Sequence, residues 1–311
     1  MVGSRALALL PVLIGVSLLT FALLNLLPGG PVEAMLSTGA TPATINALTH
    51  QLHLDQPWPL RYVEWIGNAL RGDLGTSYIY NVPVARLLSQ RLPVTLELIT
   101  LSQLMALALA IPLGIVGGYR IGSAIDQFLT AITFVLVALP PFVLALLLIL
   151  ILAVKLGVFP AAGFVSANVS LPGNLQSVAL PSLTLALGSM AIYQRVLRSE
   201  IAGTLQEEFI AVARAKGLSV RRILLVHALR PSSLPLVTVL GLTIGNLIGG
   251  TIVVEQIFGL PGIGTLLVNA IYSRDYITVQ GAVLVIAVGF VAINLVIDAT
   301  YALLDPRVRK S

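Results

Sequence analysis

The chain has 311 residues, of which 57% are hydrophobic, 10% are charged and none is cysteine. A soluble domain is roughly half apolar and about a quarter charged, so these few charges would not cover the surface of a soluble protein of this length. The composition excludes a disulfide scaffold and a cysteine metal site, and it indicates a membrane protein. The net charge of +5 would suggest nucleic acid only if the basic residues lay away from membrane spans.

Six apolar segments are long enough to cross a bilayer as helices, which takes roughly 20 residues each. Helices are expected because lipid offers the backbone no hydrogen-bond partners, and no segment shows the alternation typical of a membrane barrel. We therefore predict an all-α membrane protein with six transmembrane helices. The segments are residues 6–27, 93–119, 127–154, 177–195, 231–254 and 276–297.

Two of these segments carry further signals. Arg5 precedes the first segment, so a secretory signal peptide is an alternative interpretation. The first segment is long for the apolar core of a signal peptide, and no small-residue cleavage site follows it, so we interpret it as a span. Pro140 and Pro141 interrupt the third segment and predict a kink there.

The basic residues predict the orientation of the chain in the membrane. With the N-terminus inside, twelve basic residues lie on the inner side, and most of the outer ones lie in one long loop, 28–92, which weighs little in such a count. We therefore predict inner termini, and basic residues that set topology and contact lipid rather than nucleic acid. The inner residues are Arg5, Arg120, Arg195, Arg198, Arg214, Lys216, Arg221, Arg222, Arg230, Arg307, Arg309 and Lys310.

The chain divides into four parts on this topology. Residues 1–27 are the N-terminus and first span, and residues 28–92 form an outer loop that holds both tryptophans and a helix start at Thr41-Pro42. Residues 93–304 hold the other spans, and residues 305–311 form an inner tail. The third part includes an inner segment, 197–230, for which we predict one or two short helices that stop at Gly217.

The inner segment is the most informative stretch of the chain. Its composition alone fits a solvated loop with basic residues at the membrane surface. It contains an acidic residue, several small residues and a glycine, and Leu234-Pro235 follows farther along the chain. The stretch reads Glu208-Phe209-Ile210-Ala211-Val212-Ala213-Arg214-Ala215-Lys216-Gly217-Leu218. This spacing resembles the cytoplasmic coupling motif of binding-protein-dependent ABC permeases. Together with His227-Ala228-Leu229-Arg230 it resembles the dipeptide and oligopeptide permease family.

The resemblance extends along nearly the whole chain, in order and at the family's spacing. Two positions depart from it: Pro231 stands where a polar residue is expected and His53 where glycine is commoner. The matching stretches are Leu27-Pro28-Gly29-Gly30-Pro31, Leu54-Asp55-Gln56-Pro57, Arg61-Tyr62, Gly72-Asp73-Leu74-Gly75-Thr76-Ser77, Pro93-Val94-Thr95-Leu96-Glu97-Leu98, Glu255-Gln256-Ile257-Phe258-Gly259-Leu260-Pro261-Gly262-Ile263-Gly264 and Asp305-Pro306-Arg307-Val308-Arg309.

The resemblance implies the fold of a type I ABC importer permease, in the subunit with the long first extracytoplasmic loop, in a bacterial inner membrane. It implies a second, similar permease, two cytoplasmic ATPases that hold ATP and Mg, and an extracytoplasmic substrate-binding protein. The implied cargo is a short peptide, with nickel or another small solute as the alternative. It also implies that Glu208, Ala211, Ala215, Lys216, Gly217 and Leu218 couple the chain to an ATPase.

The sequence itself indicates that ATP hydrolysis is not done by this chain. It lacks the G-x-x-x-x-G-K-[ST] phosphate loop, so we predict a transport subunit without catalytic residues, a cofactor of its own or a metal site. His50 and His53 could share a helix face, but two ligands without a third are weak grounds for a metal. An intramembrane enzyme is disfavoured because no nucleophile motif is present. A sensor or structural subunit would leave the coupling motif unexplained.

Two further sets of residues concern the spans. Gly241, Gly245 and Gly249 recur every four residues, which predicts close helix packing, pore lining or both, and Asn246 among them is a candidate polar contact of the pathway. Glu97, Glu255 and Asp298 lie near span ends. An ion-coupled secondary transporter would need such carboxylates near the bilayer midplane, so we disfavour that class.

Overall fold

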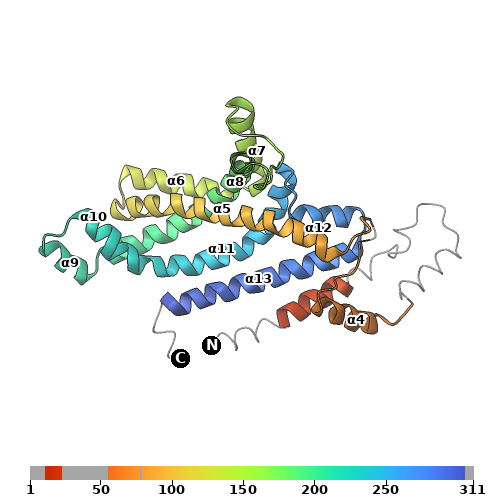
Figure 1. The fold of residues 1–311 in the computed structure, drawn as a ribbon. Helices are drawn as coiled ribbons and strands as arrows, with labels where there is room; N and C mark the ends of the chain where they lie inside the picture. The colour runs from red at the N-terminus through yellow and green to blue at the C-terminus, as the bar shows by residue number, and fades with distance from the viewer. Residues whose placement is uncertain (1–10, 23–54, 78, 305–311) are drawn as a thin grey trace. The chain divides into compact units, whose positions relative to one another are not determined.

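The computed structural model describes residues 11–22, 55–77 and 79–304, the last eight of these by their backbone alone. This part of the chain is helical and holds no strand, only an isolated bridge between Thr76 and Pro83 (Figure 1). A short helix, Pro11–Ala22, comes first. The others are α4 Trp58–Leu70, α5 Val84–Tyr119, α6 Ala124–Ala138, α7 Pro141–Leu148, η1 Ile149–Lys155, α8 Leu171–Thr204, α9 Glu208–Ala215, α10 Val220–Arg222, η2 Ile223–Ala228, α11 Leu229–Phe258, α12 Ile263–Tyr272 and α13 Tyr276–Leu304.

Within the described residues, four helices are long and apolar enough to cross a membrane, and a bent pair makes a fifth candidate. The four run over Val84–Tyr119, Leu171–Thr204, Val220–Phe258 and Tyr276–Val296, and the pair is α6 with Pro141–Lys155. They overlap the predicted spans two to six, which confirms a multi-span helical membrane protein. The first predicted span is described only as Pro11–Ala22, too short for this test, so the number six stays a prediction.

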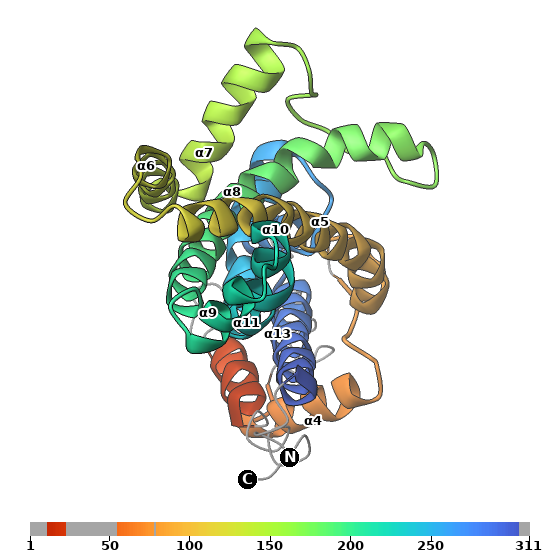
Figure 2. The same ribbon diagram turned by 90° about the vertical axis from the view of Figure 1, so that its left-hand side faces the viewer.

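The predicted kink in the third span is a sharp break. α6 and the helix after it meet at 109°, and Figure 2 shows α7 rising away from α6. Proline disfavours helical backbone in the residue before it, and Leu139 accordingly takes an extended conformation with ψ 124°. Pro141 then occupies the first turn of α7, where its missing N–H leaves no bond unmade.

The structure forms two compact units. One comprises the described residues up to Thr95 together with Pro261–Ala292, and the other comprises Leu96–Leu260 and the described residues from Ile293 on. The larger unit is built around α8, which packs against α11 and α6. Its core contains the buried Tyr193, Leu197 and Ile201.

Glycines on α5 allow a close approach to α8 within the larger unit. A Cβ atom at Gly118 would lie 2.7 Å from the backbone oxygen of Arg198 and 2.8 Å from the side chain of Ile201. Gly114 faces Leu197 in the same way, at 3.0 Å. Small residues let membrane helices come together at backbone distance, so these positions hold the two helices in register.

The smaller unit is held by a buried carboxylate and an aromatic cluster. Asp275 is fully buried and accepts hydrogen bonds from the hydroxyls of Ser77, at 2.5 Å, and Thr278, at 2.7 Å. These bonds tie the turn after α4 to the start of α13. Trp65 of α4 packs with Phe21 of the helix Pro11–Ala22, at 5.9 Å between ring centroids. The helix predicted from Thr41 lies outside the described residues.

Candidate coupling site

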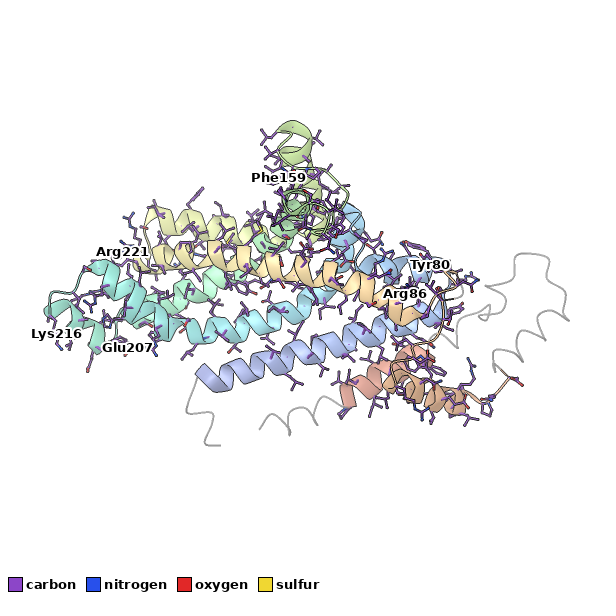
Figure 3. All side chains as sticks on the ribbon, in the orientation of Figure 1. Tyr80, Arg86, Phe159, Glu207, Lys216 and Arg221 are labelled. Atoms are coloured by element: carbon purple, nitrogen blue, oxygen red, sulfur yellow. The ribbon has the colours of Figure 1, made fainter. Side chains whose placement is uncertain are left out.

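The inner segment predicted to be coupling machinery folds as two short helical pieces between α8 and α11. α8 runs on to Thr204, α9 covers Glu208–Ala215, and α10 with η2 leads into α11. α9 and α10 stand at the end of the larger unit, where Figure 3 labels Glu207, Lys216 and Arg221. An acid in the first turn of α9 and Arg214 in its last turn both suit the helix dipole.

α9 ends at a left-handed glycine, as the sequence predicts. Gly217 has φ +73°, a conformation that costs an L-residue with a Cβ about 1–2 kcal/mol. The N–H of Gly217 donates to the carbonyl of Arg214 at 2.9 Å, and the N–H of Leu218 donates to the carbonyl of Ala213 at 3.2 Å. These two bonds make a Schellman motif, which fixes the direction in which the chain leaves the helix.

One face of α9 is buried against the rest of the segment. Ile210 and Ala213, three residues apart, are buried together with Ile223 of η2. Leu205 and Leu218 pack against the same cluster. Because residues at i and i+3 share a helix face, this small core fixes which side of α9 faces outward.

The outward side of α9 carries the residues singled out from the sequence. Glu208, Ala211 and Ala215 are all exposed and lie on one face, at i, i+3 and i+7. Beside them Phe209 is 47% exposed and Val212 is 53% exposed. Lys216 and Gly217 are exposed, and Leu218 is half-buried in the small core. The structure therefore brings five of the six residues to a free surface that is partly apolar.

An ion pair connects the helices next to this segment, and the sequence analysis missed it. The guanidinium of Arg198 on α8 donates to both carboxylate oxygens of Asp126 at the start of α6, one of them at 2.6 Å. Asp126 is almost fully buried and also accepts the N–H of Gly122 at 2.9 Å. The Ser123-x-x-Asp126 pattern is a helix-start signal that could have located the carboxylate, but no local pattern names Arg198 as its partner.

The four residues predicted for the pathway or helix packing separate into two groups. Gly241 and Gly245 are buried within α11, whereas Gly249 is exposed, with nothing within 4 Å of a Cβ placed there. Asn246 is exposed and lines a cavity of about 220 Å³ together with Thr243 and Ser189. Buried polar groups adjoin this cavity: the hydroxyl of Tyr193 donates to Gln103, and Gln103 donates to Ser189 at 3.4 Å.

The remaining acidic residues and histidines form no metal site in the described part of the chain. Glu255 is fully buried near the end of α11 and Glu97 is half-buried. The side chain of Asp298, and all of His50 and His53, lie outside the described residues. Within the described residues, no three His, Cys, Asp or Glu side chains lie close enough together to hold a metal.

Several helices long and apolar enough to cross a membrane define a membrane protein. The comparisons with known proteins agree. Residues 110–310 match the family of binding-protein-dependent transport system inner membrane components, and residues 1–99 match its N-terminal family. The chain belongs to this family, whose members are the membrane subunits of ABC importers and not their ATPases.

Curated relatives cover almost the whole chain. A putative peptide transport system permease protein of Brucella abortus (strain 2308) is 39% identical over 300 residues, 96% of each chain. The oligopeptide transport system permease protein AppB of Bacillus subtilis is 37% identical, over 98% of this chain and 97% of its own. A probable peptide ABC transporter permease protein of Sinorhizobium fredii is 33% identical, with the same shares covered.

Proposed function

We propose that this chain is one of two membrane permeases of an ATP-driven importer, and that its cargo is a short peptide. The coupling role is supported by the structure of α9. A small core holds this helix in place, and Glu208, Ala211 and Ala215 lie on its exposed face. The peptide cargo is supported by the names of the relatives.

The proposed partners are those that the family implies. The sequence has no phosphate-loop motif, and in this proposal two cytoplasmic ATPase subunits supply the ATP and Mg sites. A second, similar permease forms the other wall of the pathway, and an extracytoplasmic binding protein delivers the cargo. To shift the permease almost completely from one conformation to the other, a partner must bind the second conformation about 5.5 kcal/mol more tightly than the first. A rigid α9 is suited to transmit this free energy, because Gly217 fixes the direction in which the chain leaves the helix.

The topology that goes with this function has six spans, both termini in the cytoplasm and an extracytoplasmic loop at residues 28–92. The parts of the chain are then 1–27, 28–92, 93–304 with the coupling segment 197–230, and the tail 305–311. The pathway runs beside α11, where Asn246 lines a cavity and Gly241, Gly245 and Gly249 shape the helix surface.

The test is a pull-down of the tagged chain from membranes in a gentle detergent. We expect the wild type to bring down a phosphate-loop ATPase and a second permease, and the double variant Glu208→Ala, Gly217→Val to lose the ATPase. Glu64→Ala is the control, because Glu64 is also an exposed acid, on α4 of the smaller unit. Elution of the wild type alone, without ATPase activity, would contradict the proposal and turn attention to ion-driven transport through Glu97, Glu255 and Asp298.

A further inference from the structure

A groove on the side of the larger unit combines unpaired charges with an apolar wall. It lies between α6 and α8, has a volume of about 560 Å³, and is lined by Thr130, Phe134, Ile192, Arg195, Val196, Arg198, Ser199 and Glu200. Arg198 is occupied by its ion pair with Asp126. Among the described residues, Arg195 and Glu200 have no ion-pair partner, which leaves one positive and one negative charge for a ligand.

Arg195 is held in place without being neutralised. Its guanidinium carbon lies 4.5 Å from the centroid of the Phe134 ring, a distance at which an aromatic face attracts a cation. The ring contact fixes the direction of the side chain while its N–H groups stay available as donors. The hydroxyls of Thr130 and Ser199 line the same groove. This set of donors suits the oxygens of a phosphate group.

The groove lies at the depth of lipid headgroups. Residues 156–194 contain no charged side chain, and Arg195 is the first charge after them. α8 has 34 residues and is therefore about 51 Å long, well beyond the hydrocarbon thickness of about 30 Å. The end of α8 after the apolar run accordingly extends past the hydrocarbon, and a basic residue at this point sits at the membrane surface.

The groove changes character along its length. Ile192 and Phe134 lie at the end of the groove near the uncharged residues 156–194. Arg195 follows, and Glu200 lies five residues later, toward the end of α8. A phospholipid has the same order: an acyl chain, then a phosphate, then the headgroup substituent. The carboxylate beyond the phosphate position selects a substituent that is positive and can donate hydrogen bonds.

We propose that this groove binds a phosphatidylethanolamine molecule, with its phosphate at Arg195 and its ammonium group at Glu200. An anionic lipid such as phosphatidylglycerol would place no positive group at Glu200, so it would bind more weakly. The inference needs only a membrane-spanning chain, and it stands apart from the cargo and from the ATPase partner.

The test measures lipid retention by the full-length chain. The chain is reconstituted in vesicles of equal parts phosphatidylethanolamine and phosphatidylglycerol, extracted gently, and its bound lipids are counted by native mass spectrometry. We expect Arg195→Gln to lower retention of both lipids about fivefold, the effect of one basic residue at a membrane surface. Glu200→Gln should lower retention of phosphatidylethanolamine and raise that of phosphatidylglycerol, a gain that misfolding would not produce. Arg86→Gln, an exposed arginine of the smaller unit, is the matched control.

Two further measurements distinguish a bound lipid from a free phosphate ester and from a protein that covers the groove. Glycerophosphoethanolamine, the soluble headgroup, should displace little lipid if the apolar wall contributes; full displacement would show that the groove takes a free phosphate ester and would overturn the lipid assignment. Unchanged lipid retention in Arg195→Gln would also overturn it. Loss of a co-purifying permease with lipid unchanged would show that a protein covers the groove. ATPase co-purification is read separately, so failure of the coupling proposal is distinguishable.

Discussion

At the scale of single residues, the backbone decides which side chains matter in the coupling segment. Gly217 combines a φ of +73° with open space around the position of a Cβ. A substitution there therefore acts through backbone strain and not through a clash. Leu218, the next residue, belongs to the small core that positions α9. A backbone change at Gly217 therefore shifts Leu218 and, through this core, the face of α9 that carries Glu208 and Ala211.

Gly217→Val is expected to cost about 1–2 kcal/mol in the local structure, since a β-branched residue resists the left-handed region. We expect the reconstituted importer to hydrolyse ATP while transporting several-fold less cargo per ATP, measured by parallel phosphate-release and uptake assays.

A matched glycine separates strain from bulk. Gly67 lies within helix α4, also has nothing within 4 Å of a Cβ, and lacks the positive φ. Gly67→Val should leave the uptake-to-hydrolysis ratio near that of the wild type. An unchanged ratio in Gly217→Val would remove the claim that the exit from α9 carries the coupling.

At the scale of helices, the contact of α5 with α8 supports the coupling end of the larger unit. Gly118 touches the backbone of Arg198, and Arg198 in turn holds Asp126 at the start of α6. Three helices therefore meet near the end from which α9 projects. The close contact leaves no room for a side chain on α5 at this point.

Gly118→Ala puts a Cβ at 2.7 Å from a backbone oxygen, which a flexible side chain cannot relieve, and overpacking of this kind costs about 1–3 kcal/mol. We expect a lower midpoint of thermal unfolding in detergent. Gly289→Ala on α13, where nothing lies within 4 Å, is the control and should leave the midpoint unchanged or raised. Equal midpoints for the two variants would show that α5 and α8 are not in tight contact there.

The sequence located the helices better than it located their contacts. Apolar runs and the Pro140-Pro141 pair predicted the long helices and the break, because these are local properties. Glycines recur on both α5 and α11, and the pattern alone does not say which face meets a neighbour. The pattern singled out Gly249, which is exposed, and gave no signal for Gly118, where a Cβ would lie 2.7 Å from a backbone oxygen of α8.

The same division holds for the candidate site. Gly217 ends a helix through its own backbone, so its role follows from its neighbours in the chain. The pairing of Asp126 with Arg198 joins residues 72 positions apart, and the Arg195 groove depends on a ring from another helix. Such contacts are decided by packing, which no local pattern records.

At the scale of the whole molecule, the distribution of basic residues predicts which side of the membrane each segment faces. The positive-inside count predicts that segment 197–230 lies in the cytoplasm and that loop 28–92 lies outside. Cysteine is absent from the natural sequence, so a single introduced thiol reports its own side without background. Ala215 on α9 and Tyr80 before α5 are both exposed and suit such labels.

In intact spheroplasts, a membrane-impermeant maleimide should label Tyr80→Cys within minutes and leave Ala215→Cys unlabelled until the membrane is permeabilised. The physical reason is that basic residues beside spans are retained on the cytoplasmic side, and Arg214, Lys216, Arg221 and Arg222 cluster around Ala215 in the sequence. A cysteine placed at Leu242, in the middle of a predicted span, is the control for labels blocked by lipid or protein and not by side. Labelling of Ala215→Cys from outside would invert the topology and, with it, remove α9 from the reach of any cytoplasmic ATPase.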